Sequence, residues 1–399
     1  MAAQQDIMIS VLGAGHAGHA VIGDLWLRGF RANLFDHPDF ERDTLEPIRS
    51  LGGVNMVPAP GIKISLEHEG LAKINGKVTS NIKEAITDVD LVVLTVPSHA
   101  HRVYFELVLP HLEDGTTVLI NTGNWGALEF YGILKKEEKE KLGNIAETNS
   151  LWFAARRYNY MTDMSQPATV AISSAKKGVG VGVMPANKTD AVIEKLNKVW
   201  PQFYAMPDIV RSSGMNPNLR HLPIMLLNVG WLETTKGDFL FWKDGCSPHV
   251  AKIIKAVDDE RMSVTRSLGF ETVPIGYYNT DIAEWQNIPE SLPSFQYYED
   301  VQNLPFAPIA RAGRIWDEGY GDRPFKYRYL EEDAAYVYVP IAGLGRVTQV
   351  PTPTTDALIN LACKVNEIDY WGVGRNLERL GIAGLSVEQI EKYIMTGEY

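Results

Sequence analysis

The stretch MISVLGAGHAGHAVIGDLWLRG, residues 8–29, joins an apolar run to a helical pattern through a glycine-rich turn. The run is typical of a buried strand, and Gly29 is placed to stop the helix. Gly13, Gly15 and Gly18 fit the spacing G-x-G-x-x-G. These glycines allow a tight turn out of the strand, close approach of the backbone to a pyrophosphate, and close packing of helix on strand. The stretch therefore predicts a dinucleotide-binding strand–turn–helix unit.

The residues around this turn indicate which dinucleotide it binds. His16 and Ala17 lie inside the turn, where the N–H groups at the start of the helix face the phosphates. Asp36 ends the next strand eighteen residues after Gly18, where a carboxylate accepts hydrogen bonds from the ribose hydroxyls and repels a 2′-phosphate. We therefore expect NAD as the preferred cofactor. His37 and Arg42 lie nearby in the sequence and leave NADP open.

Further strands and helices alternate up to about residue 205. Expected strands include residues 31–36, 90–97, 116–123 and 143–150, and helical patterns separate them. Alternation of this kind predicts a Rossmann-type, doubly wound parallel sheet with helices on both faces, over residues 1–205. Residues 62–80 are expected to form a hairpin with Asn75–Gly76 as its turn. The glycine-rich residues 175–185 indicate a strand, because no helix follows them directly.

From residue 206 to residue 399 the patterns predict a mainly α-helical second domain. Residues 247–269 form the longest helical pattern, with Ser247 as N-cap and Pro248 at the first helical position. The run YVYVPIAG, residues 336–343, is apolar and strand-like. Residues 270–329 are rich in aromatic residues and prolines, which indicates either a wall over a ligand or irregular helices that pack through their rings.

The composition limits the classes of partner. The chain has 399 residues, of which 45% are hydrophobic, and a formal net charge of -11. This acidic balance argues against nucleic acid and membrane surfaces and favours small molecules. Two cysteines make a disulfide framework improbable. With no apparent signal peptide or membrane-spanning run, a cytoplasmic protein is expected, and a homodimer is left open.

Polar residues at strand ends are the first candidates for a site. Thr95, Pro97 and Thr122 follow apolar strands and are expected to border the cofactor. His99 and His101 lack nearby ligand partners at metal spacing, so no metal is expected. In the helical half the candidates are His221, which precedes an apolar helix, and the acidic group at residues 331–333.

An ordered set of motifs is similar to the opine dehydrogenases of the octopine/nopaline dehydrogenase family. The motifs are GAGHAGHA, LTVPSHAH, TGNWGALEF, AETNSLWFAAR, RHLPIMLLN, VDDERM, RYLEEDAAYVYVPIAGLGR, VPTPTTDALINLA and RNLERLGIAGLS. They run from the first strand nearly to the C-terminus. Residues 270–327 align poorly with the family, which leaves the amine undefined.

The resemblance implies a reaction and a set of site residues. The family condenses the amino group of an amino acid with a 2-oxo acid, often pyruvate, and reduces the imine with NADH or NADPH. His221 matches the catalytic histidine, and Asp333 matches the aspartate that pairs with it. Thr148 and Arg156 match positions that line the substrate sites, and Asn124 lies where some members carry a substrate-contacting amide.

The chemistry of imine reduction agrees with these assignments. A hydride must reach carbon, and one group that titrates near neutrality can move the proton, which suits His221. A carboxylate on its far ring nitrogen would orient the ring; Asp333 is expected there, with Glu332 as the alternative. A hydroxy acid dehydrogenase of the same plan would use the same pair, and an NAD(H)-sensing binding protein would turn nothing over.

Overall fold

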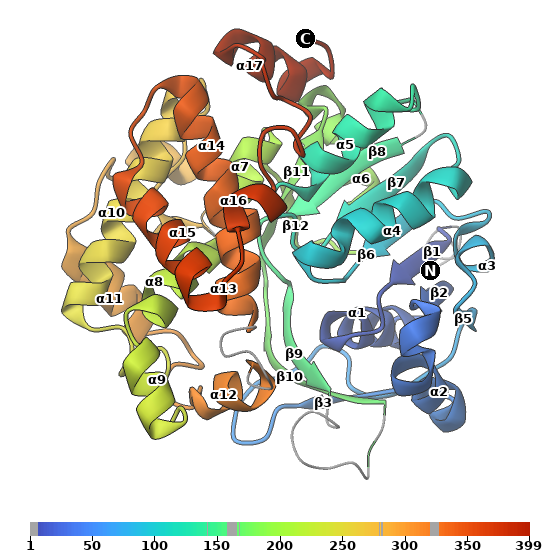
Figure 1. The fold of residues 1–399 in the computed structure, drawn as a ribbon. Helices are drawn as coiled ribbons and strands as arrows, with labels where there is room; N and C mark the ends of the chain where they lie inside the picture. The colour runs from blue at the N-terminus through green and yellow to red at the C-terminus, as the bar shows by residue number, and fades with distance from the viewer. Residues whose placement is uncertain are drawn as a thin grey trace. The chain divides into compact units, whose positions relative to one another are not determined.

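The structure is a computed structural model that describes residues 7–141, 143–157, 166, 168–278, 280, 282–319 and 327–399. The chain divides into two compact units, Met1–Pro207 and Asp208–Tyr399. Figure 1 shows the first unit in blue to green and the second in yellow-green to red. The first unit contains two β-sheets with helices, and the described residues of the second unit are mainly helical.

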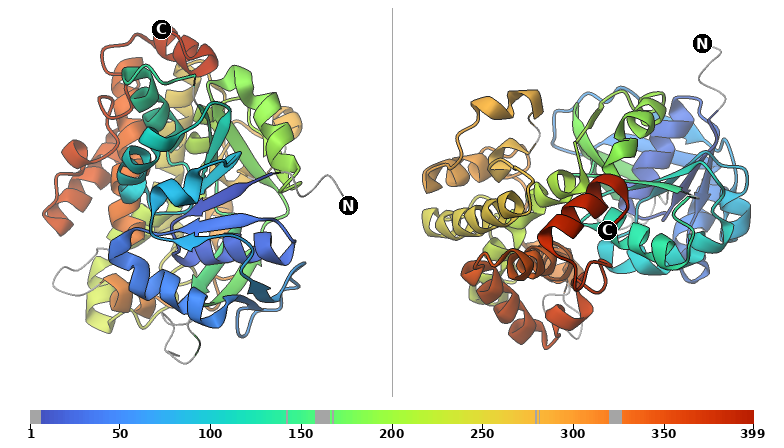
Figure 2. Two further views of the ribbon diagram at one scale, coloured as in Figure 1. Left: turned by 90° about the vertical axis from the view of Figure 1, so that its right-hand side faces the viewer. Right: turned by 90° about the horizontal axis from the view of Figure 1, so that it is seen from above.

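The first unit is built on an eight-stranded sheet. Its strand order is β12 (Phe203–Ala205), β11 (Val179–Met184), β8 (Gly143–Thr148), β7 (Thr116–Ile120), β6 (Leu91–Leu94), β1 (Ile9–Leu12), β2 (Ala32–Phe35) and β5 (Val78–Thr79). Helices cover both faces of this sheet (Figure 2). They are α1 (His16–Leu27), α2 (Glu41–Leu51), α3 (Ile82–Ile86), α4 (His101–Val108), α5 (Gly126–Lys136) and α6 (Thr189–Asn197).

The expected doubly wound sheet is confirmed, with one reversed strand pair. Every neighbouring pair in the sheet is parallel except β8 with β11, which is antiparallel. A parallel return needs a crossover that carries the chain back along the sheet. Between β8 and β11 the chain instead forms two strands of the second sheet, β9 (Phe153–Arg157) and β10 (Thr169–Ala175). It then re-enters the first sheet as β11, which runs antiparallel to β8. Residues 175–185 contain a strand, β11, as predicted.

A second sheet replaces the predicted hairpin. Its order is β4 (Gly70–Lys73), β3 (Gly53–Pro58), β10 and β9. The hairpin prediction for residues 62–80 is wrong, because β4 pairs with β3 whereas β5 joins the first sheet beside β2. At the expected turn, a Cβ atom on Gly76 would lie 2.0 Å from the Ala32 carbonyl oxygen. The Asn33 side chain accepts from the Lys77 amide at 2.9 Å. These contacts with β2 direct the chain from one sheet to the other.

The helical unit is organised around one long helix, α10 (Pro248–Ser267). Ser247 caps it as expected, since its side chain accepts from the Val250 amide at 3.3 Å. The other α-helices are α7 (Ile209–Gly214), α8 (His221–Leu226), α9 (Val229–Thr235), α11 (Ser294–Gln302), α12 (Gly313–Gly319), α13 (Arg328–Asp333), α14 (Val339–Thr348), α15 (Pro353–Asn366), α16 (Tyr370–Val373) and α17 (Val387–Thr396). Of these, α7, α8, α11, α14 and α15 contact α10.

The apolar run at residues 336–343 is helical, so the strand-like interpretation is wrong. A π-helix, Ala334–Tyr338, continues α13 and leads into α14. A continuous apolar run cannot distinguish a buried strand from a buried helix, because neither has a polar face. The acidic residue that ends α13, Asp333, therefore lies within a continuous helical segment, and the residues of the π-helix that follows it are all buried.

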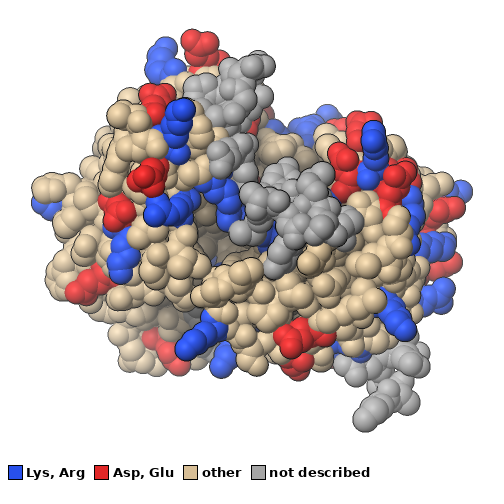
Figure 3. Space-filling model, turned by 90° about the horizontal axis from the view of Figure 1, so that it is seen from below, with Lys and Arg blue, Asp and Glu red and all other residues tan. Residues whose placement is uncertain are grey.

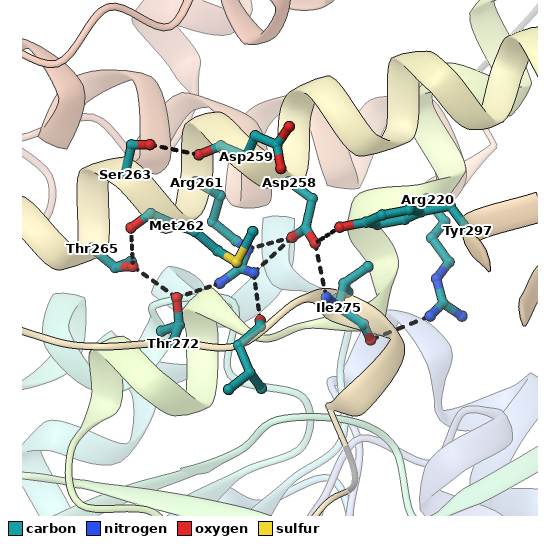
Figure 4. A network of polar contacts seen from close by, with 11 residues as sticks. Arg220, Asp258, Asp259, Arg261, Met262, Ser263, Thr265, Thr272, Ile275 and Tyr297 are labelled. Carbon is teal, nitrogen blue, oxygen red and sulfur yellow. Dashed lines mark hydrogen bonds and ion pairs between the residues drawn. The ribbon is translucent and has the colours of Figure 1, made fainter. Parts of the chain in front are cut away.

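A buried ion pair fixes one turn of α10 (Figure 4). Asp258 accepts from Arg261 Nε at 2.7 Å, from the Tyr297 hydroxyl at 2.7 Å and from the Ile275 amide at 2.8 Å. Arg261 also donates to Thr272 Oγ1 at 2.7 Å. Asp258 and Arg261 are both fully buried, so each charge depends on the other for its stability. The network connects α10 to α11 through Tyr297, and to the segment that follows α10 through Thr272 and Ile275.

This network predicts unequal costs for two neighbouring carboxylates. Asp258→Asn should lower the free energy of unfolding by about 3–5 kcal/mol, because the Arg261 charge would stay buried without its partner. Asp259 lies next to it but is partly exposed and pairs with Lys255. Asp259→Asn should cost about 1 kcal/mol or less. Urea unfolding followed by circular dichroism measures both, and equal losses would contradict the assignment.

Candidate active site

The glycine turn joins β1 to α1 through very close backbone contacts. Gly13 has φ +97°, and a Cβ atom there would lie 2.4 Å from Val96 Cγ1. A Cβ atom on Gly18 would lie 1.8 Å from the Gly13 carbonyl oxygen. Gly15 is the N-cap of α1, and a Cβ atom there would meet nothing within 4 Å. Gly13 and Gly18 are thus required by the turn itself, whereas Gly15 leaves the open backbone that a phosphate needs.

The other predicted cofactor residues follow the carboxyl ends of parallel strands. Thr95 Oγ1, just after β6, donates to the Gly13 carbonyl at 2.7 Å and so ties this strand end to the turn. His16 begins α1, and its Nδ1 accepts from the Arg157 amide at 3.1 Å. Pro97 follows β6, and Thr122 is buried after β7. This edge of a doubly wound sheet is where dinucleotides bind, so the residues present fit that group.

Asp36 lies directly after β2 and is held by three donors. The Ala14 amide of the glycine turn donates to Oδ2 at 3.1 Å. The His37 amide and the Tyr104 hydroxyl donate to Oδ1 at 3.0 and 2.8 Å. The His37 ring lies 3.3 Å from the Asp39 carboxylate, and Arg42 is exposed on α2. The carboxylate is therefore positioned beside the turn as a ribose-binding group would be.

The three predicted substrate-binding residues of the first unit are in two places. Thr148 ends β8 and is buried, with Oγ1 3.3 Å from Asn121 Oδ1. Asn124 is also buried and donates to Ser98 Oγ at 2.8 Å. Arg156 lies on β9, in the other sheet, and donates to the Ala155 carbonyl at 2.9 Å. Thr148 and Asn124 thus follow neighbouring strands of one sheet, and the substrate roles of all three residues remain predictions.

In the helical unit, His221 and Asp333 form a direct hydrogen bond. His221 Nδ1 lies 2.6 Å from Asp333 Oδ2, although 112 positions separate the two residues. His221 is the first residue of α8 and Asp333 is the last residue of α13. The residues are 7% and 1% exposed. Nε2 makes no hydrogen bond to any residue that the structure describes, so this nitrogen is the one available to a substrate.

Aromatic rings confine the imidazole of His221. Tyr329 stacks on it with ring centroids 3.8 Å apart, and Trp242 meets it at 5.2 Å with an interplanar angle of 62°. Phe241 contacts the Tyr329 ring and Phe306 contacts the Trp242 ring. The rings restrict the rotation of the imidazole and give it largely apolar surroundings.

Sequence reasoning assigned no role to Arg328. This residue begins α13, and its Nε lies 3.4 Å from the Glu332 carboxylate. Its side chain is 34% exposed, so its remaining donors are accessible to a ligand. The signal present in RYLEED was the spacing of Arg328 and Glu332, because residues four apart on a helix are neighbours and an opposite-charge pair is expected there.

Burial and charge change the proton affinities in this cluster. Burial, together with the positive charges of Arg328 and Arg220, lowers the pKa of His221 well below its ordinary value of 6.5. Burial and the negative charge of Glu332 raise the pKa of Asp333. The lowered pKa favours the neutral imidazole. When Asp333 is ionised, Nδ1 donates to the carboxylate and Nε2 can take up a proton.

The surface carries charges of both signs. On the face in Figure 3, Lys and Arg side chains are interspersed with Asp and Glu among the described residues. A nucleic-acid interface would need a continuous basic patch, which the described part of this face lacks. No helix within the described residues is both long enough and apolar enough to cross a membrane.

Known proteins are similar to this chain in both of its units. Residues 208–366 match the family model for the α-helical domain of NAD/NADP octopine/nopaline dehydrogenases. An opine dehydrogenase from Arthrobacter sp. (strain 1C) is 28% identical over 96% of this chain and 98% of its own length. An octopine dehydrogenase structure with NADH and pyruvate superposes with a TM-score of 0.70 at 17% identity, covering 98% of both chains. A yersinopine dehydrogenase with bound NADP+ covers 98% of each chain, with a TM-score of 0.68 and 15% identity.

The structural matches establish the fold, and the sequence matches agree with it over nearly the full length. The glycine turn, the helical domain and the ordered motifs all point to the same group of proteins. Residues 208–366 therefore match the α-helical domain of the octopine/nopaline dehydrogenase family, and the chain as a whole is similar to opine dehydrogenases.

Proposed function

We propose that this protein is an opine dehydrogenase. It condenses the amino group of an amino acid with a 2-oxo acid such as pyruvate, reduces the imine with NADH, and catalyses the reverse oxidation. The observation that carries this proposal is the 2.6 Å hydrogen bond between His221 and Asp333 in a domain that matches the family model. The glycine turn and Asp36 support NADH as the reductant.

His221 moves protons through Nε2. An amino acid arrives as an ammonium ion, and the neutral imidazole takes one proton so that the free amine can attack the carbonyl. The imidazolium, stabilised by Asp333, then returns this proton to the departing hydroxyl, which leaves as water and forms the iminium. NADH held by the glycine turn and Asp36 would supply the hydride for the iminium carbon. One side chain serves both proton transfers, and the lowered pKa of His221 favours the neutral form with which the cycle begins.

Arg328 binds a substrate carboxylate in this proposal. An opine carries two carboxylates, and a guanidinium can hold one of them with two parallel hydrogen bonds. Arg328 is partly exposed and close enough to lower the pKa of His221 by its charge. A carboxylate bound there would neutralise this charge and favour the imidazolium when it is needed. Arg156, which sequence analysis placed at a substrate site, is the candidate for the second carboxylate.

The apolar rings around His221 support an amine with an apolar or aromatic side chain. Tyr329, Trp242, Phe241 and Phe306 make the surroundings of His221 largely apolar, which favours an apolar side chain nearby over a charged one. This assignment concerns the amine alone. It leaves the reaction type unaffected.

An assay of NADH oxidation distinguishes an opine dehydrogenase from a hydroxy acid dehydrogenase and from an NAD(H) sensor. A hydroxy acid dehydrogenase would oxidise NADH with a 2-oxo acid alone, whereas an opine dehydrogenase requires the amine as well. A sensor of NAD(H) would bind the nucleotide and show no turnover with any pair of substrates. The His221–Asp333 pair argues against the sensor, because a binding protein needs no proton carrier.

Replacement of His221 should abolish most of the activity. His221→Asn is expected to lower kcat by about 10²–10⁴-fold, the usual effect of removing a general acid–base group. NADH absorbance with pyruvate and an amino acid panel measures the rate. His249, exposed near the start of α10, provides the control. His249→Asn should retain wild-type activity, and retained activity in His221→Asn would disprove the assignment.

The low pKa of His221 predicts the pH dependence of opine oxidation. This direction uses the neutral imidazole, which is present above the pKa of His221. Because that pKa is lowered below 6.5, kcat/KM should fall only as the pH drops below 6.5. Arg328→Gln should move this fall to higher pH, since a positive charge that lowers the pKa is removed. Arg266→Gln, an exposed arginine of the same unit, should leave the profile unchanged; a fall above pH 7 in the wild type would contradict the prediction.

The ring cluster predicts a preference among amines. With pyruvate and NADH, kcat/KM should be higher for phenylalanine or leucine than for arginine or lysine. Trp242→Ala should reduce this preference, because one of the rings is lost. A clear preference for arginine or lysine in the wild type would exclude an apolar amine while leaving the opine reaction in place.

A further inference from the structure

Tyr104 makes a buried hydrogen bond to the acid that ends β2. Its hydroxyl donates to Asp36 Oδ1 at 2.8 Å, although the two residues are 68 positions apart. Tyr104 is 4% exposed and Asp36 is 5% exposed. The ring of Tyr104 also packs edge-on against Phe35, with centroids 6.0 Å apart. Helix α4 therefore reaches the acid from a separate element of the fold.

The donors around Asp36 leave it little freedom. An ionised carboxylate offers about four acceptor positions on its two oxygens. Oδ1 accepts from Tyr104 and from the His37 amide, and Oδ2 accepts from the Ala14 amide. One position remains, on the oxygen that already contacts the glycine turn. Rotation of the carboxylate would break several of these bonds in a buried environment, which is costly.

We propose that Tyr104 is a positioning residue that fixes Asp36 toward the adenosine ribose and thereby sets the preference for NADH over NADPH. The inference rests on the cofactor assignment of the proposed function, and adds the residue that determines its selectivity. Tyr104 acts through Asp36, because its hydroxyl donates its hydrogen bond to the Asp36 carboxylate.

Selectivity follows from the fixed charge. To accept a 2′-phosphate, a protein must turn the acid away or bring a cation beside it. Tyr104 prevents the first, because its hydrogen bond holds Oδ1 in place. Burial and the charge of Asp36 raise the pKa of Tyr104, so the phenol stays protonated as a donor. For the second, the His37 ring lies 3.3 Å from the Asp39 carboxylate, so His37 already has an acidic partner.

The test compares nucleotide binding in Tyr104→Phe and wild type. Quenching of protein fluorescence by NADH and by NADPH gives the two Kd values for the full chain. The Kd for NADH should rise roughly tenfold, the effect of losing one hydrogen bond to a charged group. The Kd for NADPH should change by about twofold or less. The ratio of the Kd for NADPH to the Kd for NADH therefore falls.

The chain offers a matched control in its other unit. Tyr297 donates to Asp258 Oδ2 at 2.7 Å, and both residues are buried (Figure 4). Tyr297→Phe removes the same kind of hydrogen bond far in sequence from the glycine turn, and it should leave the Kd ratio unchanged even if stability falls. In an Asp36→Ala background, Tyr104→Phe should have no further effect on the ratio, because the group that it positions is absent.

The outcomes separate this inference from the proposed function. An unchanged Kd ratio in Tyr104→Phe, or equal weakening of both nucleotides, would overturn the role of Tyr104 even if opine synthesis is observed. A selective loss of NADH binding supports that role. The same loss in a protein that turns over no pair of amine and 2-oxo acid would support Tyr104 and contradict the opine reaction.

Discussion

The close approach of Gly13 and Gly18 is the constraint on which the first unit depends. Because no side chain fits between the Gly13 carbonyl and α1, the helix can pack directly against the end of β1. Residues Gly18–Trp26 of α1 are buried, and the helix contacts strands of both sheets. The same contact exposes the N-terminus of α1 and the carboxyl edge of the sheet. Packing and cofactor binding therefore share one structural cause.

In the helical unit, buried charges are stabilised by partners that are distant in the sequence. Asp258 and Arg261 neutralise each other inside the core, and Tyr297, Thr272 and Ile275 complete their hydrogen bonds. The Ile275 carbonyl also accepts from Arg220 at 3.2 Å, directly before His221. The structural network thus extends to the residue beside the proton carrier. Such a connection gives the imidazole a fixed support.

Sequence prediction succeeded where a local pattern has one physical meaning. The glycine turn, the apolar parallel strands and the Ser247 cap each depend on neighbouring residues, and all three are present. It failed where two structures satisfy the same pattern. Residues 62–80 have the turn of a hairpin, yet β4 and β5 find partners in different sheets. Residues 336–343 are apolar throughout, and their burial within the unit favours a helix.

By itself the sequence determined the class of each domain, the position of the dinucleotide turn and the identity of His221 and Asp333 as candidates, because periodicity and motif order are properties of the chain. Only the tertiary structure decided that these two side chains bond at 2.6 Å, that Arg328 lies beside them and that Tyr104 holds Asp36. These contacts join residues of different elements. Their distances and proton affinities depend on how those elements pack and exclude water, which local sequence patterns do not encode.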